Sequence, residues 1–253
     1  MRLDRFLTHR PELSRQKARQ LLLAGRVRVG GQSVQDGLHP VDQWSQIELQ
    51  AADGSWQTLQ AGAARCYLML HKPKGCVSAT QDAHHPTVMD WVEPAAALHL
   101  HLPGRLDFNT TGLLLLTNDG HWSRALSLPT SELPKTYLVT TRDPIAPETE
   151  AVFRAGIDFA YENLTTRPAT LQVIHPHQAW LTIHEGRYHQ VKRMFAAVGN
   201  KVVDLHRQAI GPVELDPNLQ PGQWRALTPV EVELLKPTPV EDGVDTQAPL
   251  ARV

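Results

Sequence analysis

Residues 104–117 read GRLDFNTTGLLLLT, in which a turn bounded by two glycines leads directly into four leucines. The leucine run predicts a buried strand, and Asp107 stands just before it. An ionised carboxylate is costly to bury unless a cation or hydrogen-bond donors meet it. Taken alone, Asp107 is more readily explained as part of a turn or a helix cap than as a catalytic group. A catalytic role requires a cationic partner elsewhere in the chain.

The charge of the chain is balanced overall but uneven locally. Its 253 residues carry a formal net charge of −1, which allows a sizeable core and excludes a uniformly basic nucleic-acid binder. Near the N-terminus only Asp4 and Glu12 oppose a group of cations, namely Arg2, Arg5, Arg10, Arg15, Lys17, Arg19, Arg26 and Arg28. This asymmetry predicts an anionic partner for the N-terminal segment.

Cysteine usage and hydropathy exclude several classes of protein. Cys66 and Cys76 are too few and too isolated for a disulfide framework or a thiolate zinc site. No apolar run approaches the roughly 20 residues that span a bilayer. The charged start, MRLDR, is unlike a signal peptide. We therefore expect a cytoplasmic protein that does not associate with membranes.

The N-terminal segment predicts a helix followed by a basic hairpin. Ser14 is placed to cap a helix whose apolar residues recur at helical spacing and which ends before Gly25. Valines and arginines then alternate over residues 26–29, and Gly30 and Gly31 offer a two-residue hairpin turn. Arginines on one face repel one another. Either a phosphate backbone lies against them or they form an ordinary solvated face.

These motifs resemble the small RNA-binding domain named for ribosomal small-subunit protein four (S4). They are RLDRFL at residues 2–7, SRQKAR at 14–19 and GRVRVGG at 25–31. The resemblance implies that the helices and the hairpin hold structured RNA through its phosphates. The implied RNA contacts are Arg2, Arg5, Arg15, Lys17, Arg19, Arg26 and Arg28.

The remainder predicts a second, larger domain. Residues 51–65 lack hydrophobic periodicity, and we assign 59–65 as a linker between domains at 1–58 and 66–236. In the larger domain, short apolar strands interleave with helical patterns, without a dinucleotide-binding fingerprint. The predicted fold class is therefore α+β, with a mixed, mainly antiparallel sheet. Residues 237–253 are dominated by Pro, Asp and Gly and are expected to form a disordered tail.

Two other stretches qualify as neighbours of Asp107. The run HEGRYHQVKR at residues 184–193 leaves a strand, turns at a glycine and enters a helix, so its cations converge on one place. Lys135 and Tyr137 lie two apart in a predicted strand and share a face, where an aromatic ring is able to stack on an extruded base. The plainer interpretations are a basic surface helix and a core tyrosine.

Taken together, the motifs resemble those of the pseudouridine synthase family. They are GRLD at residues 104–107, TGL at 111–113, KTY at 135–137, EGRYHQVKRM at 185–194 and LHRQAIG at 205–211. The resemblance implies isomerisation of a uridine in ribosomal RNA to pseudouridine, with no cofactor or metal. Small-subunit (16S) RNA is favoured over large-subunit (23S) RNA as the substrate.

The same resemblance implies roles for individual residues. Asp107 matches the catalytic aspartate, and Tyr137 matches the tyrosine that packs on the target base. Lys192 falls where the family keeps the cation paired with the aspartate, but Arg193 is adjacent, so the pairing residue is one of these two. Further substrate contacts are implied for Arg105, Arg187, Arg193 and Ile210. Whether Asp107 attacks the ribose or removes its 2′ proton stays open.

We expect a monomer whose partner is ribosomal RNA or an assembling ribosomal subunit. A noncatalytic RNA-binding assembly protein is an alternative, but it leaves Asp107, Tyr137 and Lys192 unexplained. A glycoside hydrolase usually needs two paired carboxylates, and Asp119, the nearest acid downstream, is better explained as a turn or cap. A zinc enzyme using His99 and His101 lacks a third ligand at a suggestive spacing.

Overall fold

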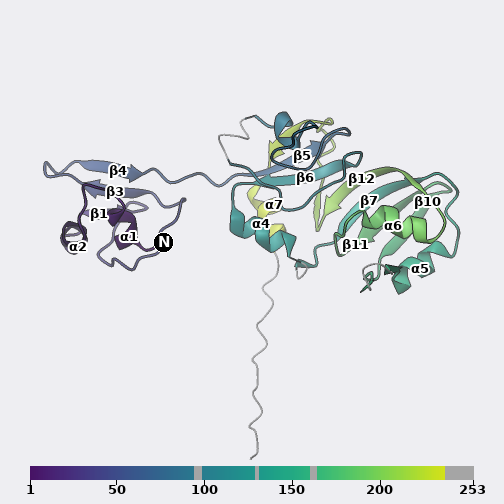
Figure 1. The fold of residues 1–253 in the computed structure, drawn as a ribbon, viewed down its shortest axis with the longest axis horizontal. Coiled ribbons are helices and arrows are strands. Elements are labelled where there is room, and N and C mark those ends of the chain that lie inside the picture. Colours follow the sequence, from purple (N-terminus) through teal and green to yellow (C-terminus); the bar gives the residue numbers. More distant parts are fainter. Residues whose placement is uncertain (94–98, 129–130, 160–163, 237–253) are drawn as a thin grey trace, which may run out of the picture. The chain divides into compact units, whose positions relative to one another are not determined.

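The computed structural model describes residues 1–93, 99–128, 131–159 and 164–236. The chain forms two compact units, Met1–Arg65 and Cys66–Val253 (Figure 1). Each unit has its own apolar core and is described by itself. The expected disordered tail at 237–253 lies outside the described residues. Within the described parts, no helix is both long and apolar enough to cross a membrane.

The first unit packs two helices on one antiparallel sheet. The sheet has the order β2-β1-β3-β4. Ser14 caps the second helix as predicted, because its hydroxyl accepts a hydrogen bond from the Lys17 N–H at 3.2 Å. Gly30 and Gly31 form the predicted hairpin turn with φ of 59° and 78°. The elements are α1 (Leu3–Thr8), α2 (Arg15–Leu23), β1 (Val27–Val29), β2 (Gln32–Ser33), β3 (Ile47–Gln50) and β4 (Trp56–Gln60).

The fourth strand corrects the linker prediction. Trp56–Gln60 was expected within the aperiodic stretch 51–65, yet it forms β4 and pairs with β3. Its register shifts next to Ile47, and none of its residues is fully buried. A short, mostly polar strand gives no clear alternation in the sequence, so the pairing with β3 decides its conformation.

The second unit is built on one large mixed sheet, which confirms the predicted fold class. Its strands have the order β10-β11-β7-β12-β6-β5-β14, and β13 pairs with β12. Of the named strand pairs in this sheet, only β12 with β6 is parallel. The strands are β5 (Tyr67–Lys72), β6 (Thr111–Thr117), β7 (Lys135–Thr141), β10 (Thr170–His175), β11 (Gln178–Ile183), β12 (Val202–Ile210), β13 (Val213–Glu214) and β14 (Trp224–Ala226). β8 (Asp158–Phe159) and β9 (Leu164–Thr165) form a separate pair.

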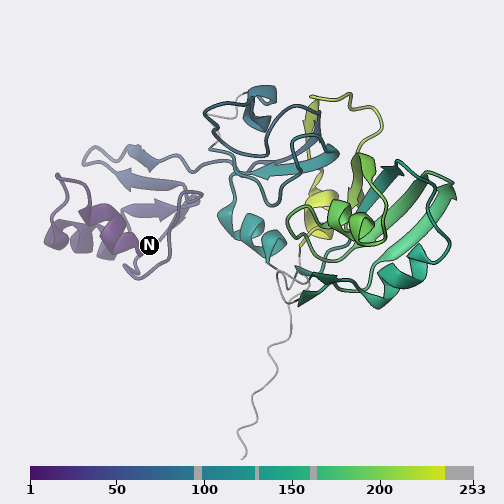
Figure 2. The ribbon, with the colours of Figure 1, turned by 45° about the vertical axis from the view of Figure 1, so that its right-hand side comes forward.

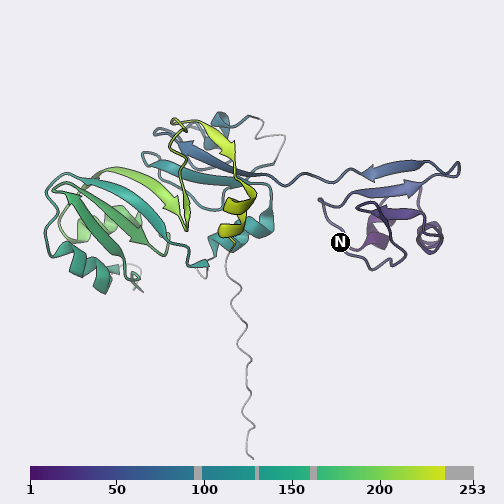
Figure 3. The ribbon, with the colours of Figure 1, turned by 180° about the vertical axis from the view of Figure 1, so that it is seen from behind.

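Helices contribute to two apolar clusters of this unit. Side chains of η1 (Val88–Trp91), α5 (Thr149–Ala155) and α6 (Gln190–Ala197) join the first cluster. Side chains of α4 (Gly120–Ser127) join the second, with α7 (Pro229–Leu234) against it. Figures 2 and 3 show α6 lying against one face of the strands near β7 and β12. Asp119 caps α4 as predicted, since its carboxylate accepts from the N–H groups of His121 and Trp122.

Gly112 allows β6 to approach β12 closely. Arg207 of β12 is its partner in the parallel register, and a Cβ atom on Gly112 would lie 2.2 Å from the Arg207 carbonyl oxygen. Gly112 also has a φ of 109°, which L side chains rarely adopt. The strand pairing that joins the two halves of the large sheet therefore depends on the absence of a side chain at this position.

Gly112→Ala should destabilise the second unit by about 3 kcal/mol or more, because the added methyl group forces β6 away from β12. Gly199→Ala is the matched control: its φ is 77°, but nothing lies within 4 Å of the added Cβ, so it introduces backbone strain of about 1–2 kcal/mol without the clash. Thermal and urea unfolding of both variants measures the difference. Equal losses would contradict the close approach.

Candidate active site

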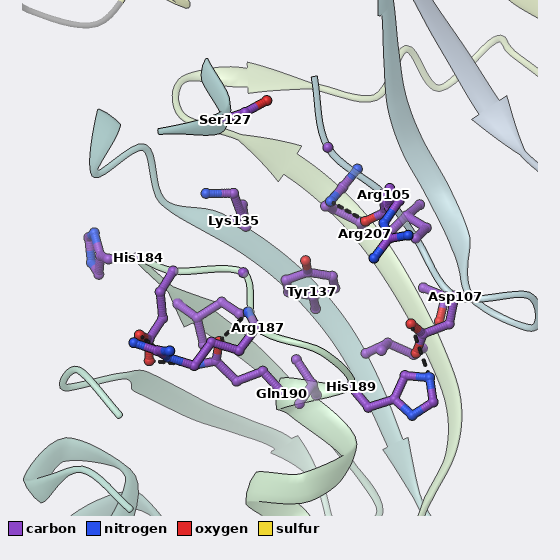
Figure 4. A pocket seen from close by; sticks show the side chains of 18 of the residues that line it. Arg105, Asp107, Ser127, Lys135, Tyr137, His184, Arg187, His189, Gln190 and Arg207 are labelled. Atoms are coloured by element: carbon purple, nitrogen blue, oxygen red, sulfur yellow. Dashed lines mark hydrogen bonds and ion pairs between the residues drawn. The ribbon is translucent and has the colours of Figure 1, made fainter. Parts of the chain in front are cut away.

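Asp107 opens onto a cleft of about 430 Å³ in the second unit (Figure 4). Its walls come from segments that are far apart in the sequence: the turn before β6, strands β7 and β12, and the connection from β11 into α6. The predicted site residues that line this cleft are Arg105, Asp107, Tyr137, Arg187 and Lys192. The fold thus brings together most of the proposed catalytic and substrate-binding residues.

Lys192 is the cation that meets Asp107. Its ammonium group donates to Asp107 Oδ2 at 2.8 Å, and both side chains are about one-third exposed or less. The other carboxylate oxygen, Oδ1, faces His189 Nε2 at 3.5 Å. Arg193 turns elsewhere, with its guanidinium 3.7 Å above the Phe159 ring. The choice between the two adjacent cations therefore falls on Lys192.

A partly buried carboxylate anchors the segment that carries Lys192. Glu185 accepts hydrogen bonds from the side chains of Arg187 and Gln190 and from the backbone N–H of Arg167. His189 then precedes α6 as its N-cap residue, in the left-handed conformation with a φ of 49°. Non-glycine residues in this conformation are uncommon and gather at functional sites. These contacts fix the start of α6, and with it the direction of Lys192.

Two buried cations hold the turn that carries Asp107. The ammonium group of Lys72, a fully buried residue, donates to the carbonyl oxygens of Phe108 at 3.3 Å and Thr110 at 3.0 Å. Arg207, 3% exposed, donates to the carbonyls of Leu113 at 2.8 Å and Arg105 at 3.4 Å. Burial lowers the pKa of Lys72. The backbone on both sides of Asp107 is therefore fixed.

Strand β7 contributes the aromatic wall of the cleft. Lys135 and Tyr137 both line it, as expected for residues two apart in a strand. Arg207 lies directly opposite Tyr137 on β12, and Figure 4 shows the two side chains as neighbours between Asp107 and Lys135. Burial, followed by the charge of Arg207, lowers the pKa of Lys135. Tyr137 itself is 7% exposed, so its ring is covered on most sides.

The cleft is basic although the whole chain is close to neutral. Only two acidic side chains, Asp107 and Glu185, are among its lining residues. Six lining residues are arginines or lysines, namely Arg105, Lys135, Arg167, Arg187, Lys192 and Arg207. Such an excess of basic side chains favours an anionic ligand. Five of these six residues remain after Lys192, the partner of Asp107, is set aside.

The structure places two predicted substrate contacts outside the cleft. Ile210 is buried in the second apolar cluster, with Met69 and Leu113, and it does not line the cleft. Arg193 lies over Phe159 and is likewise absent from the lining. The motifs gave each residue its position in the chain. They did not show that Ile210 packs in the second apolar cluster, nor that Arg193 lies on the side of α6 that faces Phe159.

The predicted RNA contacts of the first unit fall into two groups. Arg2, Arg5, Arg15 and Arg19 line a shallow pocket of about 560 Å³ beside Leu22 and Leu38. Lys17 is exposed on α2 outside that lining. Arg26 donates to the Gln50 carbonyl at 2.6 Å, and the Arg28 guanidinium lies 3.8 Å from the centre of the Trp56 ring. In the first group Arg2 is paired with Asp4, which also lines the pocket, whereas Arg26 and Arg28 are held against the sheet.

The sequence did not reveal Lys72, Arg207, His189 and Glu185 as site residues. Lys72 stands in the run HKPKG, and the other three stand in the motifs EGRYHQVKRM and LHRQAIG, so the sequence showed their positions but not their contacts. The roles of the other three depend on contacts with distant segments. Among the described residues, no group of three His, Cys, Asp or Glu side chains is arranged to hold a metal ion.

Comparisons with known proteins agree on one family. The family model described as RNA pseudouridylate synthase matches residues 66–197, and the S4 domain model matches residues 1–43. The ribosomal small subunit pseudouridine synthase A of Pseudomonas aeruginosa is 53% identical over 232 residues, 92% of this chain and 99% of that protein. The protein of the same name from Escherichia coli is 45% identical over 92% of this chain and 98% of its own length. A crystal structure of a pseudouridylate synthase is 41% identical, with a TM-score of 0.66 over 93% of this chain and 99% of that one.

Lys192→Met should change the free energy of unfolding by less than about 1 kcal/mol, because a partly exposed ion pair contributes little to stability. Glu185→Ala should cost more, about 2 kcal/mol, because three donors lose their acceptor. Denaturant titrations of the two variants test this order. A larger loss for Lys192→Met would show that the pair supports the fold instead of the site.

Proposed function

Because this chain belongs to the RNA pseudouridylate synthase family, we propose that it isomerises one uridine of small-subunit (16S) ribosomal RNA to pseudouridine. The family makes it an RNA pseudouridine synthase, and the S4 domain adds an RNA-binding unit. The choice of small-subunit RNA is supported by the names of relatives that match 92% of the chain. Modification of large-subunit (23S) RNA is the alternative outcome of the test below.

One observation carries the proposal: a single carboxylate, Asp107, meets Lys192 at 2.8 Å at the edge of a basic cleft. The lysine holds Oδ2 of the carboxylate in place and leaves the other oxygen unbonded to it. Oδ1 stays available towards the cleft, near His189. An anionic polymer such as RNA is attracted by the surrounding cations, and the carboxylate then faces the sugar of the nucleotide that enters.

The reaction moves one bond and conserves all atoms. The bond between ribose C1′ and uracil N1 breaks, the uracil turns, and C1′ bonds to C5. The proton on C5 leaves and N1 gains a proton. Asp107 takes part at the ribose, either by attacking C1′ or by removing the 2′ proton. Both routes use an oxygen of this carboxylate, and the hydrogen bond from Lys192 orients the group for either one.

The other lining residues have roles that follow from their positions. Tyr137 forms the wall against which the uracil packs, and its hydroxyl is a candidate base for the C5 proton. Arg105 and Arg187 contact the phosphates beside the extruded nucleotide. Extruding a base costs a few kcal/mol, so contacts to the flanking backbone and to the uracil ring are needed to offset that cost.

The N-terminal unit supplies binding and not chemistry. We assign it the phosphate contacts of structured RNA, through Arg2, Arg5, Arg15 and Arg19 around its pocket and through Lys17, Arg26 and Arg28 nearby. The substrate is ribosomal RNA, either free or in an assembling subunit. We propose a cytoplasmic, monomeric enzyme that needs no cofactor.

Asp107→Asn should abolish pseudouridine formation and leave RNA affinity within about twofold, because the amide has the same shape but cannot act as nucleophile or base. Purified protein is incubated with small- and large-subunit ribosomal RNA, and pseudouridine is mapped in both. Asp143→Asn, an exposed carboxylate paired with Arg142, is the control and should keep full activity. Normal conversion by Asp107→Asn would overturn its catalytic role.

Replacing both Arg15 and Arg19 with Gln should weaken RNA binding at low salt and flatten its salt dependence. If each arginine contacts one phosphate, the slope of log K against log salt falls by roughly 1.4–1.8. Arg142→Gln with Arg154→Gln, two exposed arginines of the second unit, is the matched control of equal charge. Identical salt slopes for the two double variants would contradict a phosphate-binding role for α2.

A further inference from the structure

Exposed aromatic rings flank the catalytic carboxylate, and the proposed chemistry does not use them. Tyr188 and His189 form one pair, with ring centres 3.9 Å apart and planes 18° from parallel. Phe108 and His85 form the other, edge to face at 5.2 Å. Phe108 follows Asp107 in the chain, and His189 faces its carboxylate at 3.5 Å. Both pairs therefore adjoin Asp107.

The Tyr188–His189 pair is held in place through His189. His189 is fixed at the start of α6 in a left-handed conformation and lies against Asp107. Its ring covers one face of Tyr188, yet Tyr188 remains 71% exposed. Large aromatic side chains are rarely left so open on a fixed backbone. The outward face of Tyr188 is thus a flat, ordered surface beside the reaction centre.

The second pair is equally well supported. The Phe108 carbonyl accepts hydrogen bonds from the buried Lys72 ammonium at 3.3 Å and from the Gly75 N–H at 3.0 Å, so its backbone is fixed while its side chain is 38% exposed. His85 is anchored by Asp82, which accepts from its backbone N–H at 2.8 Å and lies 3.2 Å from its ring nitrogen. The ring of Phe108 therefore projects from a rigid turn.

Unpaired RNA bases are the ligands that match these surfaces. Extruding a uridine from RNA leaves the bases on either side of it without a stacking neighbour. Exposed aromatic rings bind such bases whatever their identity, because every base has a π-face. The basic lining of the cleft supplies the matching charge for the phosphates between them. An apolar protein partner would not explain why both pairs adjoin a carboxylate surrounded by cations.

We propose that the Tyr188–His189 and Phe108–His85 pairs stack on the two nucleotides that flank the target uridine, one pair on each. The substrate is then an unpaired stretch of at least three nucleotides, and purines beside the uridine are favoured because they stack best. The inference rests on the proposed function for the identity of the central nucleotide. The stacking itself is measurable without turnover.

The test uses two unstructured heptaribonucleotides with a central uridine, one carrying 2-aminopurine on its 5′ side and the other on its 3′ side. Stacking on an aromatic ring quenches 2-aminopurine fluorescence, and the full-length protein should quench both probes. Tyr188→Ala should remove the quenching of one probe and Phe108→Leu that of the other, each with about fivefold or greater loss of affinity. Tyr188→Phe keeps the ring and should quench as the unaltered protein does.

Val173→Ala is the control, because Val173 is 47% exposed on β10 and does not line the cleft. The proposal is overturned if Tyr188→Ala and Phe108→Leu quench the 2-aminopurine fluorescence of both probes as strongly as Val173→Ala does. Pseudouridine formation in ribosomal RNA is measured on the same proteins. If ribosomal RNA is modified but quenching is unchanged in both ring variants, only the stacking inference fails. If quenching depends on the rings and no RNA is modified, isomerisation fails and the nucleotide contacts stand.

Discussion

The hydrogen bonds from two buried cations to the turn around Asp107 are the interaction on which the rest of the site depends. Lys72 holds the carbonyls just after Asp107, and Arg207 holds those on either side of the turn. Carbonyl groups are good acceptors for buried ammonium and guanidinium groups, which would otherwise be costly to bury. The turn is thus rigid although its carboxylate is partly exposed. The hydrogen bonds that compensate for burying these two charged groups also fix the backbone around Asp107.

A rigid turn explains how a modest ion pair can matter to function. The Lys192–Asp107 contact adds little to stability in this partly exposed setting, but it orients the carboxylate that we propose as the reactive group. Glu185 does the same for the opposite wall by fixing the start of α6. The geometry around Asp107 is thus maintained by contacts of Lys72, Arg207 and Glu185 with the backbone and side chains of the cleft walls.

The sequence predicted those features that are determined by interactions between residues close together in the chain. The caps at Ser14 and Asp119, the glycine hairpin and the shared face of Lys135 and Tyr137 are all set by neighbours within a few residues. β4 was missed because it depends on its partner strand. The choice of Lys192 over Arg193 was open because adjacent helical residues point about 100° apart, and only the docked helix shows which one faces the carboxylate.

The place of β12 in the sheet bears on when the enzyme becomes active during its synthesis. β12 lies between β7 and β6, so it joins the half that carries Asp107 to the half that carries Tyr137 and α6. A nascent chain that ends before Val202 already contains Asp107, Tyr137 and Lys192 but lacks the strand that unites them. Pairing of β6 with β12 is also a contact of high sequence separation, which forms slowly. The site is therefore completed only after β12 has left the ribosome.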